Sequence, residues 1–323
     1  MTDYQERVLE VNTERWLHIL REETFPTEYC PLYLTEAEMV VSVYERLYRN
    51  LDAPSIALVD WREKLSPEES EQVLKIEQRL QAVVDKFLKE KSDFIFVKTS
   101  SRSAKDAPMA QSRFKGLYQE YLAQEPEELQ STENTQITCL LRAAFCAMRV
   151  HSAREVLDMV MRSERIYQDF LLALQFKEKF CENFVIRTFV DMDVDMEFRG
   201  FVFRGNLVAL SQYNYLIHSK RLCELKDSLA ERIQTFYEAR VKPKLKDSQF
   251  EENFIIDFGI GSKGLLNVRN YAQSCSVGWL TAYHMLYLFY TSTYPLTETF
   301  LCPTWDIGHP QGSSTAVDLQ PVW

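Results

Sequence analysis

The feature that most constrains the fold of this chain is a change of hydrophobic period, from helical spacing to short apolar runs and back. Residues 66–90 carry apolar side chains at helical spacing and open with Ser-Pro-Glu-Glu, which predicts a helix with a serine cap. Residues 94–97 are then a continuous apolar and aromatic run, which predicts a buried strand. The chain therefore combines long helices with short strands.

The same spacing predicts the remaining elements. Further helices are expected at residues 4–21, 36–49, 138–148, 152–176 and 221–241, and further strands at 184–192, 196–203, 206–212 and 253–258. Thr35 is expected to cap the second helix, and Arg204-Gly205-Asn206 is expected to form the turn of a hairpin. This order favours an α+β fold over repeating βαβ units. No glycine-rich phosphate loop of a known type is present.

Composition narrows the functional classes. The chain of 323 residues has 37 Lys and Arg against 47 Asp and Glu, a net charge of −10, which disfavours general nucleic-acid binding. The seven Cys stand singly and the first residues lack an apolar run, so we expect a cytoplasmic protein with reduced thiols. Residues 277–294 are uncharged, but their scattered Tyr and Thr make a membrane span unlikely.

Residues 96–107 form the first segment with chemical potential. Lys98 ends an apolar strand, and the loop after it is rich in hydroxyls and carries Arg102, Ser103 and Lys105. Fixed cations, hydroxyls and free backbone N–H groups are what phosphate binding requires. The alternative is a solvated polar loop in which Lys98 extends its ammonium to water.

Two further segments carry charges on apolar strands. Alternation places Glu197 and Arg199 on one face of a strand, where they form either a cross-strand ion pair or part of a nucleotide cleft. Asp257 stands late in an apolar strand and is either a metal ligand or an exposed strand end. Asp191, Asp193 and Asp195 alternate like the start of a calcium loop, but the Gly and Glu of an EF-hand do not follow, so we expect a solvated loop.

Taken together, these segments resemble the cell division cycle protein 123 family. The resemblance rests on Lys98, on Ser-Ala-Lys-Asp-Ala at residues 103–107, and on Glu-Phe-Arg-Gly-Phe-Val at residues 197–202. The following strand, residues 207–213, agrees with the apolar-Ser-Gln pattern of the family. The resemblance as a whole covers residues 94–258.

The resemblance implies an ATP-grasp fold, in which two α+β subdomains enclose a nucleotide cleft. It implies ATP contacts from Lys98, Ser103, Lys105, Arg187, Glu197 and Arg199, with Arg187 near the adenine edge, and a magnesium ligand in Asp257. We expect an N-terminal helical segment at residues 1–92, an ATP-grasp-like core at 93–258 and a divergent, partly disordered tail at 259–323.

The C-terminal part departs from the family pattern. The family continues to a strand with Asp-x-Asn-Pro, which completes the magnesium site, whereas residues 259–271 contain no Asp or Glu. We therefore expect this strand to be missing, the sheet edge to be unpaired and the Mg²⁺ site to be incomplete.

Three functions follow as hypotheses. The family resemblance implies a non-enzymatic, ATP-binding factor that assists assembly of translation initiation factor two by binding its gamma subunit. An ATP-dependent ligase of the ATP-grasp superfamily is the second, and it requires magnesium-holding carboxylates that the sequence lacks. The third is an interaction protein that binds no nucleotide.

Overall fold

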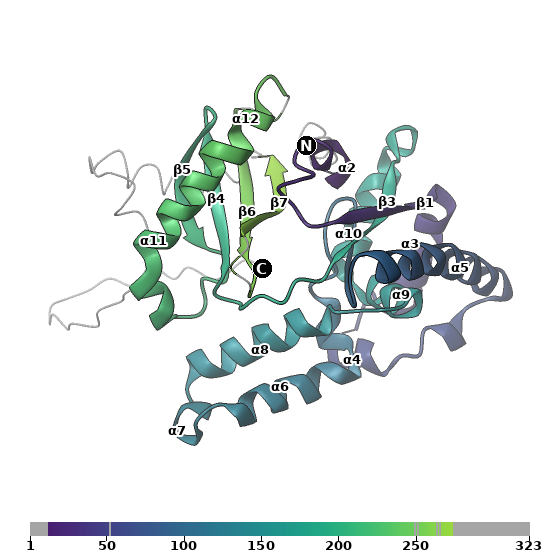
Figure 1. Ribbon diagram of the computed structural model, residues 1–323. Coiled ribbons are helices and arrows are strands. Elements are labelled where there is room, and N and C mark those ends of the chain that lie inside the picture. Colours follow the sequence, from purple (N-terminus) through teal and green to yellow (C-terminus); the bar gives the residue numbers. More distant parts are fainter. Residues whose placement is uncertain are drawn as a thin grey trace, which may run out of the picture.

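The computed structural model describes residues 12–273, except residues 52, 249, 251, 263 and 265. Its strands form two antiparallel sheets, one of order β1-β3-β2 and one of order β5-β4-β6-β7. The strands are β1 (Thr27–Leu32), β2 (Ile95–Thr99), β3 (Glu182–Thr188), β4 (Glu197–Phe203), β5 (Asn206–Gln212), β6 (Phe254–Ile260) and β7 (Leu266–Gln273). Figure 1 shows the two sheets next to each other, with most helices gathered around the first.

The helices divide between two hydrophobic cores, which agrees with the predicted α+β class. The α-helices are α2 (Thr13–Leu17), α3 (Leu34–Leu47), α4 (Ala53–Leu58), α5 (Pro67–Glu90), α6 (Ser112–Gln124), α7 (Glu127–Gln130), α8 (Glu133–Ala147), α9 (Ala153–Arg162), α10 (Glu164–Gln175), α11 (Lys220–Phe236) and α12 (Lys242–Leu245). Helices α3, α5, α9 and α10 pack with the three-stranded sheet. Helix α11 and the π-helical turn Tyr237–Val241 cover the four-stranded sheet.

The N-terminal segment joins the second core, although it precedes the first sheet in the chain. Trp16 and Leu20 are fully buried there. Thr24 forms a parallel bridge with Val268, and its hydroxyl donates to the Val268 carbonyl oxygen at 2.5 Å. Of the helix predicted at residues 4–21, the described part is helical only over Thr13–Leu17.

Helix boundaries follow local capping more closely than hydrophobic spacing. Helix α5 begins as predicted, because the Ser66 hydroxyl accepts the Glu69 N–H at 3.2 Å and the Glu69 carboxylate accepts the Ser66 N–H at 2.8 Å. The prediction of Thr35 as a cap is wrong. Helix α3 follows β1 directly, and the Glu36 carboxylate accepts the Tyr33 N–H at 3.0 Å.

The single helix predicted at residues 152–176 is instead two helices that meet at Ser163. The Ser163 hydroxyl accepts the Ile166 N–H at 3.2 Å and donates to Asp106 at 2.6 Å. It therefore caps α10 and ends the helical hydrogen bonding of α9. The apolar spacing on either side of Ser163 gave no sign of this break.

The three strands predicted between residues 184 and 212 do not share one sheet. Strand β3 ends at Thr188 and lies between β1 and β2, whereas β4 and β5 form the predicted hairpin in the other sheet. Arg204 and Gly205 form the turn with φ of 49° and 69°, which is the left-handed conformation of a two-residue hairpin turn. Strand β1 was not predicted, because Glu28 and Pro31 obscure its alternation.

The expectation that no strand follows residue 258 is wrong. Strand β6 continues to Ile260, and β7 pairs with it along its length. The edge of β6 is therefore paired, and β7 meets Thr24 on its other side. The apolar residues Leu266 and Val268 alternate with polar ones, and this two-residue period is typical of a strand.

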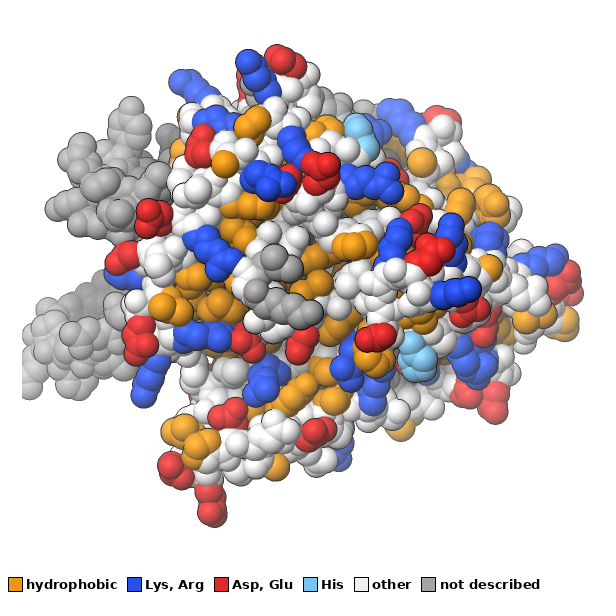
Figure 2. Space-filling view, viewed as in Figure 1, with side chains coloured by type: hydrophobic (Ala, Val, Ile, Leu, Met, Phe, Trp, Pro, Cys, Tyr) orange, Lys and Arg blue, Asp and Glu red, His pale blue; other side chains and the backbone are white. Residues whose placement is uncertain are grey.

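No helix among the described residues is long and apolar enough to span a membrane. The uncharged stretch at residues 277–294 lies outside the described residues, as does the rest of the expected tail from residue 274 on. The part of that tail before residue 274 contains the end of β6 and all of β7. On the face shown in Figure 2, Lys and Arg side chains are mixed with Asp and Glu side chains rather than gathered into one basic area.

Candidate functional site

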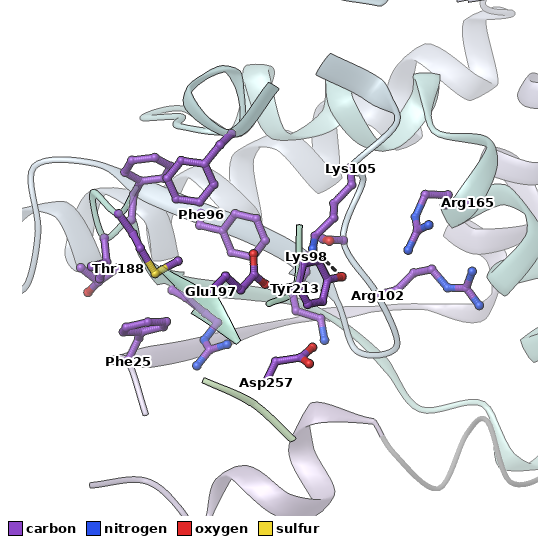
Figure 3. A pocket seen from close by; sticks show the side chains of 16 residues that line it. Phe25, Phe96, Lys98, Arg102, Lys105, Arg165, Thr188, Glu197, Tyr213 and Asp257 are labelled. Carbon is purple, nitrogen blue, oxygen red and sulfur yellow. Dashed lines mark hydrogen bonds between the residues drawn. The ribbon is translucent and has the colours of Figure 1, made fainter. Parts of the chain in front are cut away.

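A cavity of about 100 Å³ lies between the two sheets and is lined by residues from both. Its lining includes six of the seven site residues predicted from the sequence, namely Lys98, Ser103, Lys105, Arg187, Glu197 and Asp257. The seventh, Arg199, bonds to Asp257 and lies against Tyr213, and both of these residues line the cavity. Figure 3 shows Lys98, Lys105, Glu197 and Asp257 converging from several elements.

Strand register explains why these side chains meet. Phe96 of β2 lies opposite Arg187 of β3, and opposed residues of an antiparallel pair project to the same face. Lys98 is two residues further along β2, so it shares that face. In the second sheet, Arg199 of β4 lies opposite Asp257 of β6. Each sheet therefore presents a charged face toward the cavity.

The opposite face of β4 is apolar and fixes the orientation of the strand. Phe198 and Val202 are buried in the second core, and Gly200 lies between them. A Cβ atom on Gly200 would lie 2.8 Å from Leu207 Cδ1 and 2.9 Å from Phe258 Cε2, so no larger residue fits without rearrangement. This packing holds the alternate positions, 197 and 199, toward the other side.

Lys98 is buried, which contradicts the interpretation of its loop as a solvated one. Only 6% of Lys98 is exposed, and its ammonium donates to the Thr13 hydroxyl at 2.9 Å and to the Ser100 and Ser101 carbonyl oxygens at 3.4 Å. Burial, together with the nearby positive charge of Arg187, lowers the pKa of Lys98 to about 7. An anion near this ammonium would favour its charged form.

Two buried carboxyl groups lie close to Lys98, and the sequence had not indicated either. Burial and the neighbouring Glu14 raise the pKa of Glu182 to about 8, while Asn12 donates to Glu182 at 3.2 Å. Burial also raises the pKa of Asp169, which accepts from the Ser101 hydroxyl at 2.5 Å and from Arg102 at 2.9 Å. Asp169 therefore anchors the loop that carries the predicted phosphate-binding cations.

Arg199 and Asp257 form the cross-strand ion pair that was one of the two interpretations of this strand. The Nε and Nη2 atoms of Arg199 donate to the two carboxylate oxygens of Asp257 at 2.8 and 3.1 Å. Burial lowers the pKa of Arg199, but the hydrogen bonds and charge of Asp257 outweigh it and raise that pKa overall. Asp257 is 5% exposed, so its interpretation as an exposed strand end is wrong.

Arg187 is also buried, at the rim of the first sheet. Its guanidinium donates to the hydroxyls of Thr24 and Thr27 and lies 5.1 Å from the centre of the Phe25 ring. These contacts come from the N-terminal segment and β1. Arg187 therefore links the cavity wall to the part of the chain that bridges the two sheets.

One end of the cavity is apolar. Its lining there includes Phe96, Phe145, Phe189, Val190 and Met192, and the Phe145 and Phe189 rings lie 5.0 Å apart between centres. The lining cations are Lys98, Arg102, Lys105, Arg165 and Arg187, and Figure 3 shows Arg102, Lys105 and Arg165 on the side away from Phe25 and Phe96. The sequence did not reveal the apolar end, because these residues come from β2, α8 and the connector between β3 and β4.

Among the described residues there is no group of three or more His, Cys, Asp and Glu arranged to hold a metal ion. Both carboxylate oxygens of Asp257 accept hydrogen bonds from Arg199, and residues 258–273 contain no Asp or Glu. Magnesium prefers octahedral oxygen ligands, usually one or two carboxylates together with phosphates and water. The cavity lining holds two carboxylates, Glu197 and Asp257, and Asp257 is paired with an arginine.

The alternating aspartates lie on the connector between the sheets. Met192 and Val194 point inward and are buried, whereas Asp193 is exposed. Arg221 donates to Asp193 at 2.9 Å and also pairs with Asp195. These carboxylates therefore serve to hold α11 against the connector.

Comparisons with known proteins agree with this fold. A family model described as D123 matches residues 33–274, beyond the residues 94–258 of the sequence resemblance. Two structures of Cdc123 from Schizosaccharomyces pombe are similar at 16% identity. The C-terminally truncated form has a TM-score of 0.53 with 83% of this chain and 85% of its own covered, and the other has 0.54 with 88% and 92%. A search of curated proteins found no match.

Proposed function

Because the chain belongs to the D123 family, which is the Cdc123 family, we propose that it binds ATP between its two sheets and acts as a non-enzymatic assembly factor. The proposed partner is the gamma subunit of translation initiation factor two, as the family resemblance implies, and the proposed location is the cytoplasm. The observation that carries the ATP proposal is the division of the cavity into a cationic end and an aromatic end.

The cationic end suits a polyphosphate. Lys98, Arg102, Lys105 and Arg165 line it, and charged donors form the strongest hydrogen bonds to phosphate oxygens. Arg165 forms no ion pair with the residues that the structure describes, so its charge is available to a ligand. Ser103 adds a hydroxyl to the same wall.

The aromatic end suits a flat base. Phe96, Phe145 and Phe189 surround it, and Met192 adds a polarisable side chain that adapts to a ring. Ligand sites are mostly apolar with a few placed polar groups, and this end matches that description. The connector between β3 and β4 passes along it and brings backbone N–H and C=O groups near the proposed base position.

We propose that the cleft widens when ATP binds, and the cavity volume supports this. The cavity measures about 100 Å³, whereas sites for ligands of this size measure about 300–1,000 Å³. Lys105 donates to the Tyr213 hydroxyl at 3.0 Å, so one contact crosses between the loop of the first sheet and the second sheet.

The proposed binding does not depend on magnesium. Arg199 already neutralises Asp257, and no second carboxylate follows on β7. A guanidinium can stabilise phosphate charge in the position where a metal ion would otherwise act. The same features disfavour the ligase hypothesis, because acyl-phosphate chemistry in such enzymes relies on metal ions held by carboxylates.

The test is calorimetric titration of the protein with ATP, with and without Mg²⁺. Lys98→Ala is expected to weaken binding by about 1.5–3 kcal/mol, the value of a hydrogen bond to a charged group. Lys75→Ala is the matched control, because Lys75 is 66% exposed on α5. Equal affinity in the Lys98 variant would refute the site, and tightening by Mg²⁺ of about tenfold or more would refute the metal-independent mode.

A second experiment tests the partner. The immobilised protein is used to pull down purified gamma subunit in the presence and absence of ATP. Lys98→Ala serves as the variant defective in nucleotide binding. We expect ATP to increase recovery of the gamma subunit with the wild-type chain only. Absence of the gamma subunit under all conditions would refute the assembly role while leaving the ATP site intact.

A further inference from the structure

Tyr213 contacts two cations, one from the part of the chain next to the three-stranded sheet and one from the four-stranded sheet. The Lys105 ammonium lies 3.0 Å from the Tyr213 hydroxyl and 4.4 Å from the centre of its ring, and the Arg199 guanidinium carbon lies 4.7 Å from the same centre. Lys105 belongs to the loop after β2, whereas Arg199 belongs to β4. Figure 3 draws the hydrogen bond from Lys105 to Tyr213. The Tyr213 ring therefore lies between a cation of the loop after β2 and a cation of the four-stranded sheet.

The backbone holds Tyr213 in this position. Tyr213 follows the last residue of β5, and its N–H donates to the Glu197 carbonyl oxygen at 2.9 Å. That bond ties it to the first residue of β4, two positions before Arg199. The ring is half-buried and lines the cavity, and the backbone bond that anchors it does not involve Lys105.

The two cations differ in how their charges are balanced. Arg199 has a carboxylate partner in Asp257, but Lys105 has none within ion-pair distance in the part of the chain that the structure describes. An aromatic ring attracts a cation through its quadrupole and does not cancel its charge. Tyr213 therefore holds Lys105 in place and leaves its positive charge available to a ligand.

We infer that Tyr213 is the positioning residue of a polyphosphate subsite, in which Lys105 and Arg199 contact successive phosphoryl groups of one ligand. A single phosphate reaches one of these cations, whereas a chain of two or three phosphates reaches both. The subsite therefore distinguishes ligands by the length of the phosphate chain. This inference rests on the proposed function for the identity of the cleft, but it requires no adenine.

The experiment uses the full chain with three ligands, namely ATP, AMP and inorganic tripolyphosphate, each titrated calorimetrically without Mg²⁺. Tyr213→Leu removes the ring, and Tyr213→Phe keeps the ring without the hydroxyl. Tyr215→Leu is the control, because Tyr215 is 72% exposed two residues further on. Tyr213→Met is a second variant without a ring, for use if the leucine variant shows a lowered melting temperature.

Loss of the ring is expected to weaken the binding of ATP and tripolyphosphate about tenfold or more, and the binding of AMP about twofold or less. The affinities of the Phe variant are expected to stay within about threefold of wild type. Tripolyphosphate binding that is unchanged in both ring-less variants would overturn the inference, as would equal losses in the Phe and Leu variants. If the wild type binds tripolyphosphate with this dependence but binds no ATP, the inference stands and the proposed function fails. If the wild type binds neither ligand, both are overturned.

Discussion

Replacing Glu182 with Gln isolates one buried charge next to Lys98. Glutamine has the shape of glutamate and keeps an oxygen that accepts the hydrogen bond from Asn12, but it does not ionise. Burial and Glu14 raise the pKa of Glu182 from an ordinary value of 4.5 to about 8. The substitution therefore removes the cost of ionising a buried carboxyl group and leaves the packing in place.

The sign and size of the effect follow from linkage. A carboxyl group whose pKa is higher in the folded chain than in the unfolded chain destabilises the fold as the pH rises from the unfolded-state pKa to the folded-state pKa. For Glu182 that window runs from pH 4.5 to about pH 8. At 1.36 kcal/mol per pKa unit, the wild type is expected to lose up to about 4 kcal/mol relative to the Gln variant across it.

The assay is urea unfolding of wild type and Glu182→Gln at pH values from 4.5 to 8. Taking the difference between the two proteins cancels groups that titrate alike in both, and the remaining groups that act on Glu182 are Glu14, Asp169 and Lys98. Glu71→Gln is the control, because Glu71 is 66% exposed. If the two unfolding free energies run parallel across this range, folding does not raise the pKa of Glu182 and the inference fails.

Gly200→Ala is expected to lower the unfolding free energy by about 1–3 kcal/mol through overpacking. Gly116→Ala is the control: a Cβ there meets nothing within 4 Å, so this change is expected to raise the unfolding free energy by about 0.5–1 kcal/mol. Equal effects of the two changes in urea unfolding would contradict the close packing of β4. Ser163→Ala is expected to cost about 1 kcal/mol through loss of the α10 cap, and an unchanged melting temperature would count against that cap. Asp257→Asn releases Arg199 and is expected to tighten ATP binding in the absence of Mg²⁺. Weaker binding in the same titration would contradict this release of Arg199 toward the ligand.

Elements with a local signal were predictable from the sequence. The Ser66 cap, the apolar run before Lys98 and the Arg204-Gly205 turn each appear within a few residues, and the structure contains all three features. The division of strands between two sheets was not predictable. β3 and β4 are neighbours in sequence, but β3 pairs with β1 and β2, and only long-range packing decides this.

The candidate site shows the same division. Lys98, Arg199 and Asp257 were nominated because a charge on an apolar strand is visible in the sequence. Glu182 and Asp169 were missed, because their burial depends on which helix and loop pack over them. The pairing of Arg199 with Asp257 links residues 58 positions apart and depends on the register of β4 and β6, which no local pattern encodes.

The contact between Thr24 and Val268 has a consequence for biosynthesis. The two residues are 244 positions apart, and the second core also includes Trp16 and Leu20. A ribosome that adds about 5–20 residues per second needs roughly 12–50 s to reach Val268 after Thr24. During that interval the first sheet and its helices can form, but the partners of the N-terminal apolar residues are incomplete. Until β7 has been made, the nascent chain therefore lacks part of the core that buries Trp16 and Leu20, and during this interval it is most open to chaperones and to aggregation.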